Sequence, residues 1–334
     1  MDTQTPQKFL RRKHLDNISK IGCQLTIPSS PHLTKLGFGT GVNVWKLERS
    51  PTGKNQSPWA IKRLSKTARE QKGNEIYDIR LKAEAEILRK LSHPNIIGFR
   101  AFEKSSEGVD SLAIECCTTC LGTILEERCE DDLGPLPANE IWKVVLDISN
   151  ALKYLHEEAK LLHADLKSFN ILIKGDFEIC KLCDFGVSLP LNDEGIIDFT
   201  KNPDLEYIGT QLWSAPEVID GETIICSKSD IFSFGLIIYE TLALLPPHTL
   251  KINDDEEAKE NSDITNESLD TSTESMCYGT RPPLPENFQV SDEYKEIIEL
   301  FFICTNELPE DRPTASVIFK IASDFIKKSQ KDAK

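Results

Sequence analysis

The sequence predicts an α+β protein with two lobes, a small β-rich N-terminal lobe that contains one main helix and a larger helical C-terminal lobe. Three observations lead to this prediction. Short β-like runs occupy much of residues 33–115, and apolar residues recur at helical spacing from residue 138 onward. The length of 334 residues suits a two-lobed unit better than three domains.

The N-terminal lobe is expected over residues 30–114. Residues 1–29 are polar and rich in Pro and Ser, which predicts a flexible arm. One helical stretch at about 77–91 interrupts the β-like runs, which are Val42–Leu47, Trp59–Arg63, Ile96–Phe102 and Ser111–Glu115. Residues 115–119 are expected to connect the two lobes.

The C-terminal lobe is expected over residues 120–328, followed by a tail at 329–334. One apolar stripe at helical spacing consists of Ile141, Val144, Ile148, Leu152 and Leu155. The segment 229–245 is apolar nearly all round and predicts a buried helix. In a last helix, at about 314–328, we expect Val317, Ile321 and Phe325 to share the apolar face.

The net charge of −15 is concentrated in one segment. Residues 251–275 contain nine acidic residues and two lysines, a balance of 2 − 9 = −7, and predict a disordered acidic insert. An acidic chain is a poor partner for nucleic acid. The sequence has neither a membrane-length apolar run nor a signal peptide, so we expect no membrane partner and a cytoplasmic and/or nuclear location. Reduced thiols are favoured over disulfides or zinc for the ten cysteines.

A glycine-rich segment, Gly37-Phe38-Gly39-Thr40-Gly41, is the first candidate for phosphate binding, because glycines let backbone N–H groups approach a phosphate. Alone it is weaker evidence than an ordinary turn. The strand-like run Trp59-Ala60-Ile61-Lys62 follows about twenty residues later. A lone Lys at a strand end is usually solvated, but after a phosphate-binding loop Lys62 could bind the α- and β-phosphates.

A loop with acid, base and amide side chains is the next candidate. Asp165 could accept a hydroxyl proton, Lys167 could neutralise a moving phosphoryl group, and Asn170 could ligate a hard cation. Asp184, fourteen residues after Asn170 in Asp184-Phe185-Gly186, is a second possible Mg²⁺ ligand. A polar surface loop is the alternative for the first three residues.

The order and spacing of these segments resemble the signature set of protein kinases. Four further matches are Gly209-Thr210, Ala215-Pro216-Glu217, the helix motif Ser229–Gly235 with its Asp230, and Asp311-Arg312-Pro313. The resemblance covers about residues 33–328. It implies the bilobal protein-kinase fold, with ATP and Mg²⁺ as cofactors and proteins as substrates. The competing class is a pseudokinase scaffold that docks partners through the acidic insert.

The kinase resemblance also implies roles for individual residues. Glu84 is expected to pair with Lys62, with Glu86 as the other candidate. Ile114 would be the gatekeeper, and backbone groups of Glu115 and Cys117 would read adenine. The residues expected to contact the nucleotide are Leu36, Gly37, Phe38, Gly39, Thr40, Gly41, Val44, Ala60, Lys62, Ile114, Glu115, Cys117, Asn170, Leu172, Cys183 and Asp184.

Longer segments resemble the T-LAK cell-originated protein kinase family, also known as PDZ-binding kinases. These segments are Leu36–Val44, Ser57–Ala60, Ile173–Glu178, Gly186–Leu191 and Cys304–Glu307. The resemblance implies a MAP-kinase-kinase-like enzyme that acts on Ser/Thr, with dual specificity left open, in mitotic and stress-activated MAP kinase signalling. The end Lys331-Asp332-Ala333-Lys334 lacks the hydrophobic terminus that PDZ binding needs, so that role is not carried over.

Regulation is expected to differ from that of most kinases. Ala164 occupies the place where most have an Arg that pairs with a phosphorylated activation loop, so we expect control elsewhere. Thr5-Pro6 is a candidate site for an upstream proline-directed kinase.

Overall fold

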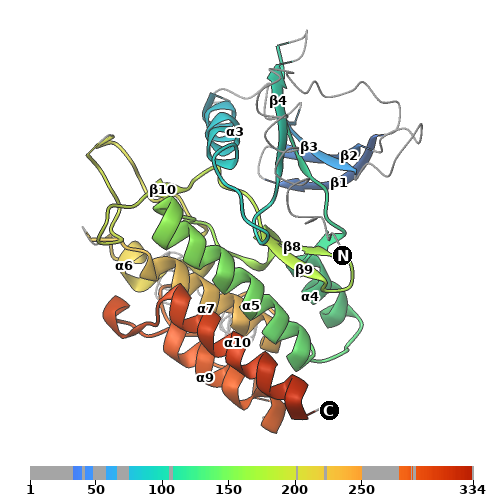
Figure 1. Cartoon of the computed structure of the whole chain (residues 1–334), viewed down its shortest axis with the longest axis vertical. Coiled ribbons are helices and arrows are strands. Elements are labelled where there is room, and N and C mark those ends of the chain that lie inside the picture. The colour runs from blue at the N-terminus through green and yellow to red at the C-terminus, as the bar shows by residue number, and fades with distance from the viewer. Residues whose placement is uncertain are drawn as a thin grey trace, which may run out of the picture.

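The computed structural model describes residues 33–39, 42–47, 58–65, 75–104, 108–200, 202–221, 224–249, 278–286, 288 and 291–332 (Figure 1). Several predictions fall outside these ranges: the N-terminal arm with Thr5, the loop residues Thr40 and Gly41, and the acidic insert. Among the described residues, no helix is long and apolar enough to cross a lipid bilayer.

A five-stranded antiparallel sheet in the order β1-β2-β3-β5-β4 forms the N-terminal lobe. Its strands are β1 (Leu33–Gly39), β2 (Val42–Leu47), β3 (Trp59–Leu64), β4 (Phe99–Lys104) and β5 (Asp110–Glu115). Helix α3 (Glu75–Leu88) packs on β4 and β5 through Leu81, Ala85 and Leu88, which are buried. This register of three or four residues is the spacing that places side chains on one helix face.

Short strands and turns follow the connector and lead into the helical lobe. Strand β6 (Thr119–Cys120) pairs with β8 (Ile171–Lys174), which pairs with β9 (Ile179–Leu182), while β7 (Leu161–Leu162) pairs with β10 (Leu189–Pro190). The helices are α4 (Leu121–Glu130), α5 (Ala138–Lys153), α6 (Pro216–Ile219), α7 (Lys228–Ala243), α9 (Lys295–Cys304) and α10 (Ala315–Asp332). Figure 1 shows these helices below the sheet, with α7 behind α5.

The helical core forms around α7, which is buried on all sides from Ser229 to Leu242. Helix α5 contributes four members of the predicted stripe and the π-helical turn after it, Tyr154–Ala159, contributes Leu155; all five are buried. Apolar side chains around a whole helix can be accommodated only where other elements cover every face, and α7 is contacted by α5, by α9 and by the turns Gln211–Trp213 and Pro309–Asp311. The predicted two-lobed α+β arrangement is confirmed.

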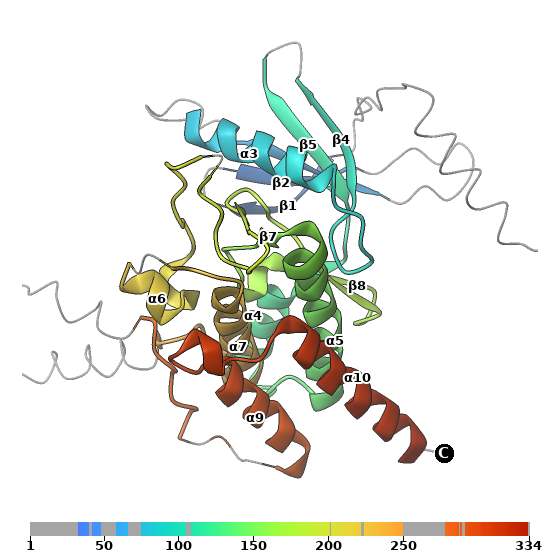
Figure 2. The ribbon, with the colours of Figure 1, turned by 60° about the vertical axis from the view of Figure 1, so that its left-hand side comes forward.

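The predicted face of the last helix is wrong. Val317 and Ile321 are 48% and 37% exposed, whereas Ile318 and Ala322 are buried. Helix α10 runs beside α5 (Figure 2), where Phe325 stacks on Trp142 with ring centroids 4.2 Å apart. Both sets of residues have helical spacing, so the position of α5 selects the buried one.

Candidate active site

Three charged side chains from separate elements meet between the lobes. Lys62 lies on β3, and its Nζ is 2.8 Å from Glu84 Oε2 on α3 and 2.8 Å from Asp184 Oδ1 after β9. The alternative candidate, Glu86, is exposed on another face of α3. The structure therefore brings Lys62 together with Glu84 and with a predicted Mg²⁺ ligand.

Burial and charge act in opposite directions on this cluster. Burial disfavours the charged form of Lys62, but the carboxylates of Asp184 and Glu84 outweigh it and raise the pKa of Lys62. Burial raises the pKa of Glu84 to about 7, although Lys62 opposes that shift. Burial also works against ionisation of Asp184, yet Lys62 holds the pKa of Asp184 below its ordinary value. Lys62 and Asp184 are therefore charged at neutral pH.

The loop that carries Asp165, Lys167 and Asn170, which we call the catalytic loop, is anchored to α7 through the buried carboxylate of Asp230. Its Oδ2 accepts the backbone N–H of His163 at 2.9 Å, and its Oδ1 accepts that of Ala164 at 3.0 Å. His156 Nε2 lies 2.8 Å from Oδ2. Ala164 has a φ of 66°, a left-handed conformation that costs free energy in residues other than Gly. The two hydrogen bonds to Asp230 stabilise that backbone conformation.

Asp165 lies at the centre of the polar contacts of this loop. Its Oδ2 accepts hydrogen bonds from Lys167 Nζ at 2.8 Å and Asn170 Nδ2 at 3.1 Å. Its Oδ1 accepts from the Thr210 hydroxyl at 2.6 Å and the Thr210 backbone N–H at 3.1 Å. Lys167 Nζ also donates to the Thr210 hydroxyl at 2.9 Å. A hydroxyl thus already occupies a place between the proposed base and the proposed cation.

Asp184 and Asn170 fit a hard divalent cation by the chemistry of their donors. Carboxylate and amide oxygens are what Mg²⁺ prefers. The Asn170 amide nitrogen donates to the backbone oxygen of Asp165 at 2.7 Å and to its carboxylate. This contact fixes the amide so that its oxygen points away from Asp165. The loop and the strand end are also joined, since Cys183 N donates to Asn170 O at 3.0 Å.

Six of the residues expected around adenine belong to one hydrophobic core or pack against it. Ala60 and Ile114 are buried and face each other across β3 and β5, and four partly buried residues pack against the same core, namely Val44, Cys117, Leu172 and Cys183. Burial raises the pKa of the Cys117 thiol to about 12 and that of Cys183 well above its usual value. These thiols stay protonated, so this group of residues is apolar and suits an aromatic base.

The glycine-rich segment lies partly within the described residues. Gly37, Phe38 and Gly39 belong to β1, where Gly37 pairs with Val44 on β2, and Leu36 is 45% exposed. Because Val44 is in turn opposite Lys62 on β3, Gly37 and the lysine belong to the same sheet, on strands that both pair with β2. Thr40 and Gly41 lie outside the described residues.

Sequence reasoning missed three side chains that support the site, namely those of Lys174, Lys181 and Glu240. Glu115 binds Lys174 Nζ at 2.8 Å and Lys181 Nζ at 3.2 Å, which together lower the pKa of Glu115 against the effect of burial. Glu240 hydrogen-bonds to the catalytic loop from inside α7. A carboxylate within an apolar helix was a signal for Glu240, because such a group needs partners when it is buried.

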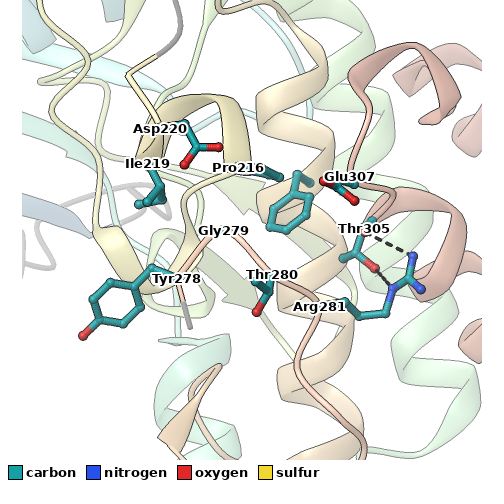
Figure 3. A pocket seen from close by; sticks show the side chains of 10 residues that line it. Pro216, Ile219, Asp220, Tyr278, Gly279, Thr280, Arg281, Thr305 and Glu307 are labelled. Carbon is teal, nitrogen blue, oxygen red and sulfur yellow. Dashed lines mark hydrogen bonds between the residues drawn. The ribbon is translucent and has the colours of Figure 1, made fainter. Parts of the chain in front are cut away.

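A hollow of about 510 Å³ lies away from these residues on the helical lobe (Figure 3). Its lining comes from α6, α7, the segment 278–281 and the loop after α9. The Arg281 guanidinium is directed at Thr305, with its Nε 2.7 Å from the hydroxyl oxygen. None of the predicted site residues lines this hollow.

Comparison with known proteins agrees with this geometry. The family model for the protein kinase domain matches residues 31–322. The chain belongs to the protein kinase family. This kinase is 42% identical over 320 residues to the human lymphokine-activated killer T-cell-originated protein kinase, a match that covers 94% of the chain and 95% of that relative. It is 27% identical over 238 residues to mouse serine/threonine-protein kinase Nek4, covering 71% of the chain and 26% of Nek4.

These findings confirm the predicted class of enzyme. The protein is a Ser/Thr protein kinase of the MAP-kinase-kinase-like type, and its resemblance to the T-LAK cell-originated kinases extends over nearly the whole chain. ATP and Mg²⁺ are the general cofactors of protein kinases, and proteins are their substrates.

Proposed function

We propose that Asp165 orients and deprotonates the hydroxyl of a Ser or Thr on a protein substrate, while Lys167 offsets charge on the γ-phosphoryl group of ATP. The observation that carries this proposal is the Asp165–Thr210–Lys167 triangle, in which both groups contact one hydroxyl. Lys62, held by Glu84, would bind the α- and β-phosphates. Asn170 and Asp184 would hold Mg²⁺, which would offset the negative charge of the phosphates. Positioning and electrostatics supply most of the acceleration in such a site.

Replacement of Asp165 by Asn tests the assignment of the base. We expect kcat to fall by about 10²–10⁴-fold, because general base catalysis contributes that much, while the affinity for ATP changes little. Asp193→Asn is the matched control, because Asp193 is 95% exposed. It lies between Asp184 and Thr210 in the chain, and the segment at Thr210 is the one that we call the substrate-facing loop. Turnover in Asp165→Asn equal to that of the control would refute the assignment.

We also propose that an apolar cluster takes the place of the ion pair that most kinases form between an Arg and a phosphorylated activation loop. Ala164 packs with Leu162, Leu189, Leu191 and Ile197, all buried, and with the partly buried Leu205 and Tyr207 further along the activation segment. Burial of these side chains stabilises the segment without a phosphate. Thr200 carries an exposed hydroxyl in this segment. Thr200→Ala should leave turnover unchanged, whereas a strong loss would favour control by loop phosphorylation.

For the cell, we propose a role in mitotic and stress-activated signalling, with MAP kinases among the substrates. The similarity to the human T-LAK cell-originated kinase supports this role. A cytoplasmic and/or nuclear location would give access to such substrates. An upstream proline-directed kinase would modify Thr5. A phosphoproteome comparison between wild-type and Asp165→Asn cells would identify substrates, and Thr5→Ala protein should show lower activity in mitosis if Thr5 is the control point.

A further inference from the structure

Glu240 is a buried carboxylate on α7 that the proposed chemistry does not use. It is 4% exposed and lies in a helix that is otherwise mostly apolar. Its Oε1 accepts the hydroxyl of Ser168 at 2.6 Å, and its Oε2 accepts the indole N–H of Trp213 at 2.8 Å. Both bonds are short, as expected where the acceptor is ionised.

The two donors belong to the two loops that form the Asp165–Thr210–Lys167 triangle. Ser168 directly follows Lys167 in the catalytic loop. Trp213 ends the turn that begins at Thr210, and its backbone N–H donates to Thr210 O at 3.0 Å. The carboxylate of Glu240 therefore connects the loop that carries Lys167 to the loop that carries Thr210.

A neutral polar side chain would cost less free energy to bury at this position than the carboxylate of Glu240 does. A carboxylate is costly to bury, and burial raises the pKa of Glu240 to about 7 even though Ser168, Trp213 and the charge of Lys167 favour its ionised form. An apolar side chain at this position of α7 would avoid that cost. What it could not do is accept a hydrogen bond from each loop at once.

We propose that Glu240 is a positioning residue that fixes the substrate-facing loop at Thr210 against the catalytic loop, and so sets where the acceptor hydroxyl lies relative to Asp165. This inference rests on the proposed role of Asp165. Glu240 itself touches no reacting atom. Its effect should fall on the protein substrate and on turnover, and ATP binding should be spared.

Glu240→Gln in the full-length kinase is the central test. The amide keeps the shape, and it can accept from Trp213 with its oxygen and donate to the Ser168 hydroxyl with its nitrogen, so folding should be retained. Two charge-assisted bonds become neutral and the loops are held less tightly. We expect kcat/KM for a protein substrate to fall roughly 10-fold with KM for ATP unchanged, because small misplacements of reacting groups are costly.

Thr241→Val is the matched control. Thr241 is the next residue on α7, equally buried, and its hydroxyl donates at 2.7 Å to Ile238 within the same helix. It removes a buried hydrogen bond without touching either loop. Equal losses of kcat/KM in the Gln and Val variants, or a matching rise in KM for ATP, would overturn the proposal.

Two further readouts separate positioning from packing. In a double-mutant cycle, Ser168→Ala should reduce kcat/KM in the wild type but have little further effect beside Glu240→Gln, since both changes weaken the same contact. The wild-type kcat/KM for the protein substrate should fall below pH 7 as Glu240 takes up a proton, and the Gln variant should lack this part of the pH profile. Additive effects or identical pH profiles would refute the inference. If Asp165→Asn also keeps full turnover, the proposed function fails, whereas a dead Asp165→Asn beside an unaffected Glu240→Gln rejects only the positioning role.

Discussion

Two groups of buried opposite charges in this kinase are built from similar residues but differ in charge balance. In the helical lobe, Arg312 and Glu217 form a two-point contact with nitrogen–oxygen distances of 2.7 and 2.8 Å, and both side chains are at most 2% exposed. Between the lobes, Lys62 faces two carboxylates, one of which, on Asp184, is 43% exposed. The first group is neutral and closed, and the second is negative and open.

The electrostatics of the two groups reflect this difference. Burial opposes the charge of Glu217, but Arg312 and the hydroxyl of Ser229 outweigh it and lower the pKa of Glu217. Glu84 and Asp184 both contact the single cation of Lys62, and burial raises the pKa of Glu84 to about 7. A balanced pair stabilises the fold, whereas an excess of negative charge beside Asp184 favours a cation. Charge balance therefore separates a structural ion pair from a candidate metal site.

The largest effect is expected from Arg312→Met. Glu217 would remain as a buried, unpaired carboxylate, so the free energy of unfolding should fall by about 3–5 kcal/mol. Denaturation in urea measures it. Adding Glu217→Gln to Arg312→Met should recover part of the loss, because no buried charge then remains. If Arg312→Met is as stable as the wild type, the Arg312–Glu217 ion pair does not stabilise the fold.

Lys62→Met should affect activity more than stability. Removing a charge from the phosphate site should lower kcat/KM by about 10²–10³-fold. Glu84 can then take up a proton at little cost, since its pKa is already about 7, and the unfolding free energy should fall much less than in Arg312→Met. Parallel kinase assays and urea titrations check both statements. Comparable destabilisation by the two variants would contradict the distinction between them.

The sequence was sufficient to single out residues that the structure brings together, because they lie in short motifs. Lys62 and Asp184 are 122 positions apart, yet the motifs predicted a phosphate-binding role for Lys62 and a Mg²⁺-binding role for Asp184 in one site. The stripe on α5 was predictable because only one face of that helix is apolar. The fold class followed from the change of period between the two halves of the chain.

What the sequence did not reveal depends on the position of neighbouring elements. Helix α10 has two apolar sets at helical spacing, and only contact with α5 decides between Ile318 and Val317. Glu240 was visible as an acid in an apolar helix, but its donors are 72 and 27 residues away. Long-range hydrogen bonds of this kind leave no periodic pattern.

The contributions of Glu217 and Glu84 to the stability of the fold should also change with pH in opposite directions. The pKa of Glu217 is lowered on folding, so its stabilising effect is present above pH 4.5 and is lost as the pH falls through the lowered value. The pKa of Glu84 is raised from 4.5 to about 7, so the folded state gains stability from its proton at low pH and loses that gain as the pH rises through 7. Stability of Glu84→Gln relative to the wild type should therefore improve from pH 5 to pH 8, whereas the deficit of Glu217→Gln should shrink in acid. Urea titrations from the acid range below pH 4.5 up to pH 8 measure both differences, and parallel curves for the two variants would contradict the assignment.

The smallest effect is expected at Glu115, where one carboxylate has an exposed and a buried partner. Lys174 is 42% exposed, and Lys174→Ala should change the unfolding free energy by less than about 1 kcal/mol, with the difference vanishing in 1 M salt. Lys181 is 8% exposed and also donates to Pro94 O at 2.7 Å, so Lys181→Met should cost more and its effect should persist in salt. Both lysines bind the same carboxylate, so the comparison sets an exposed ion pair against a buried one that has an additional backbone hydrogen bond. Equal losses would mean that burial does not grade the ion pairs of this kinase.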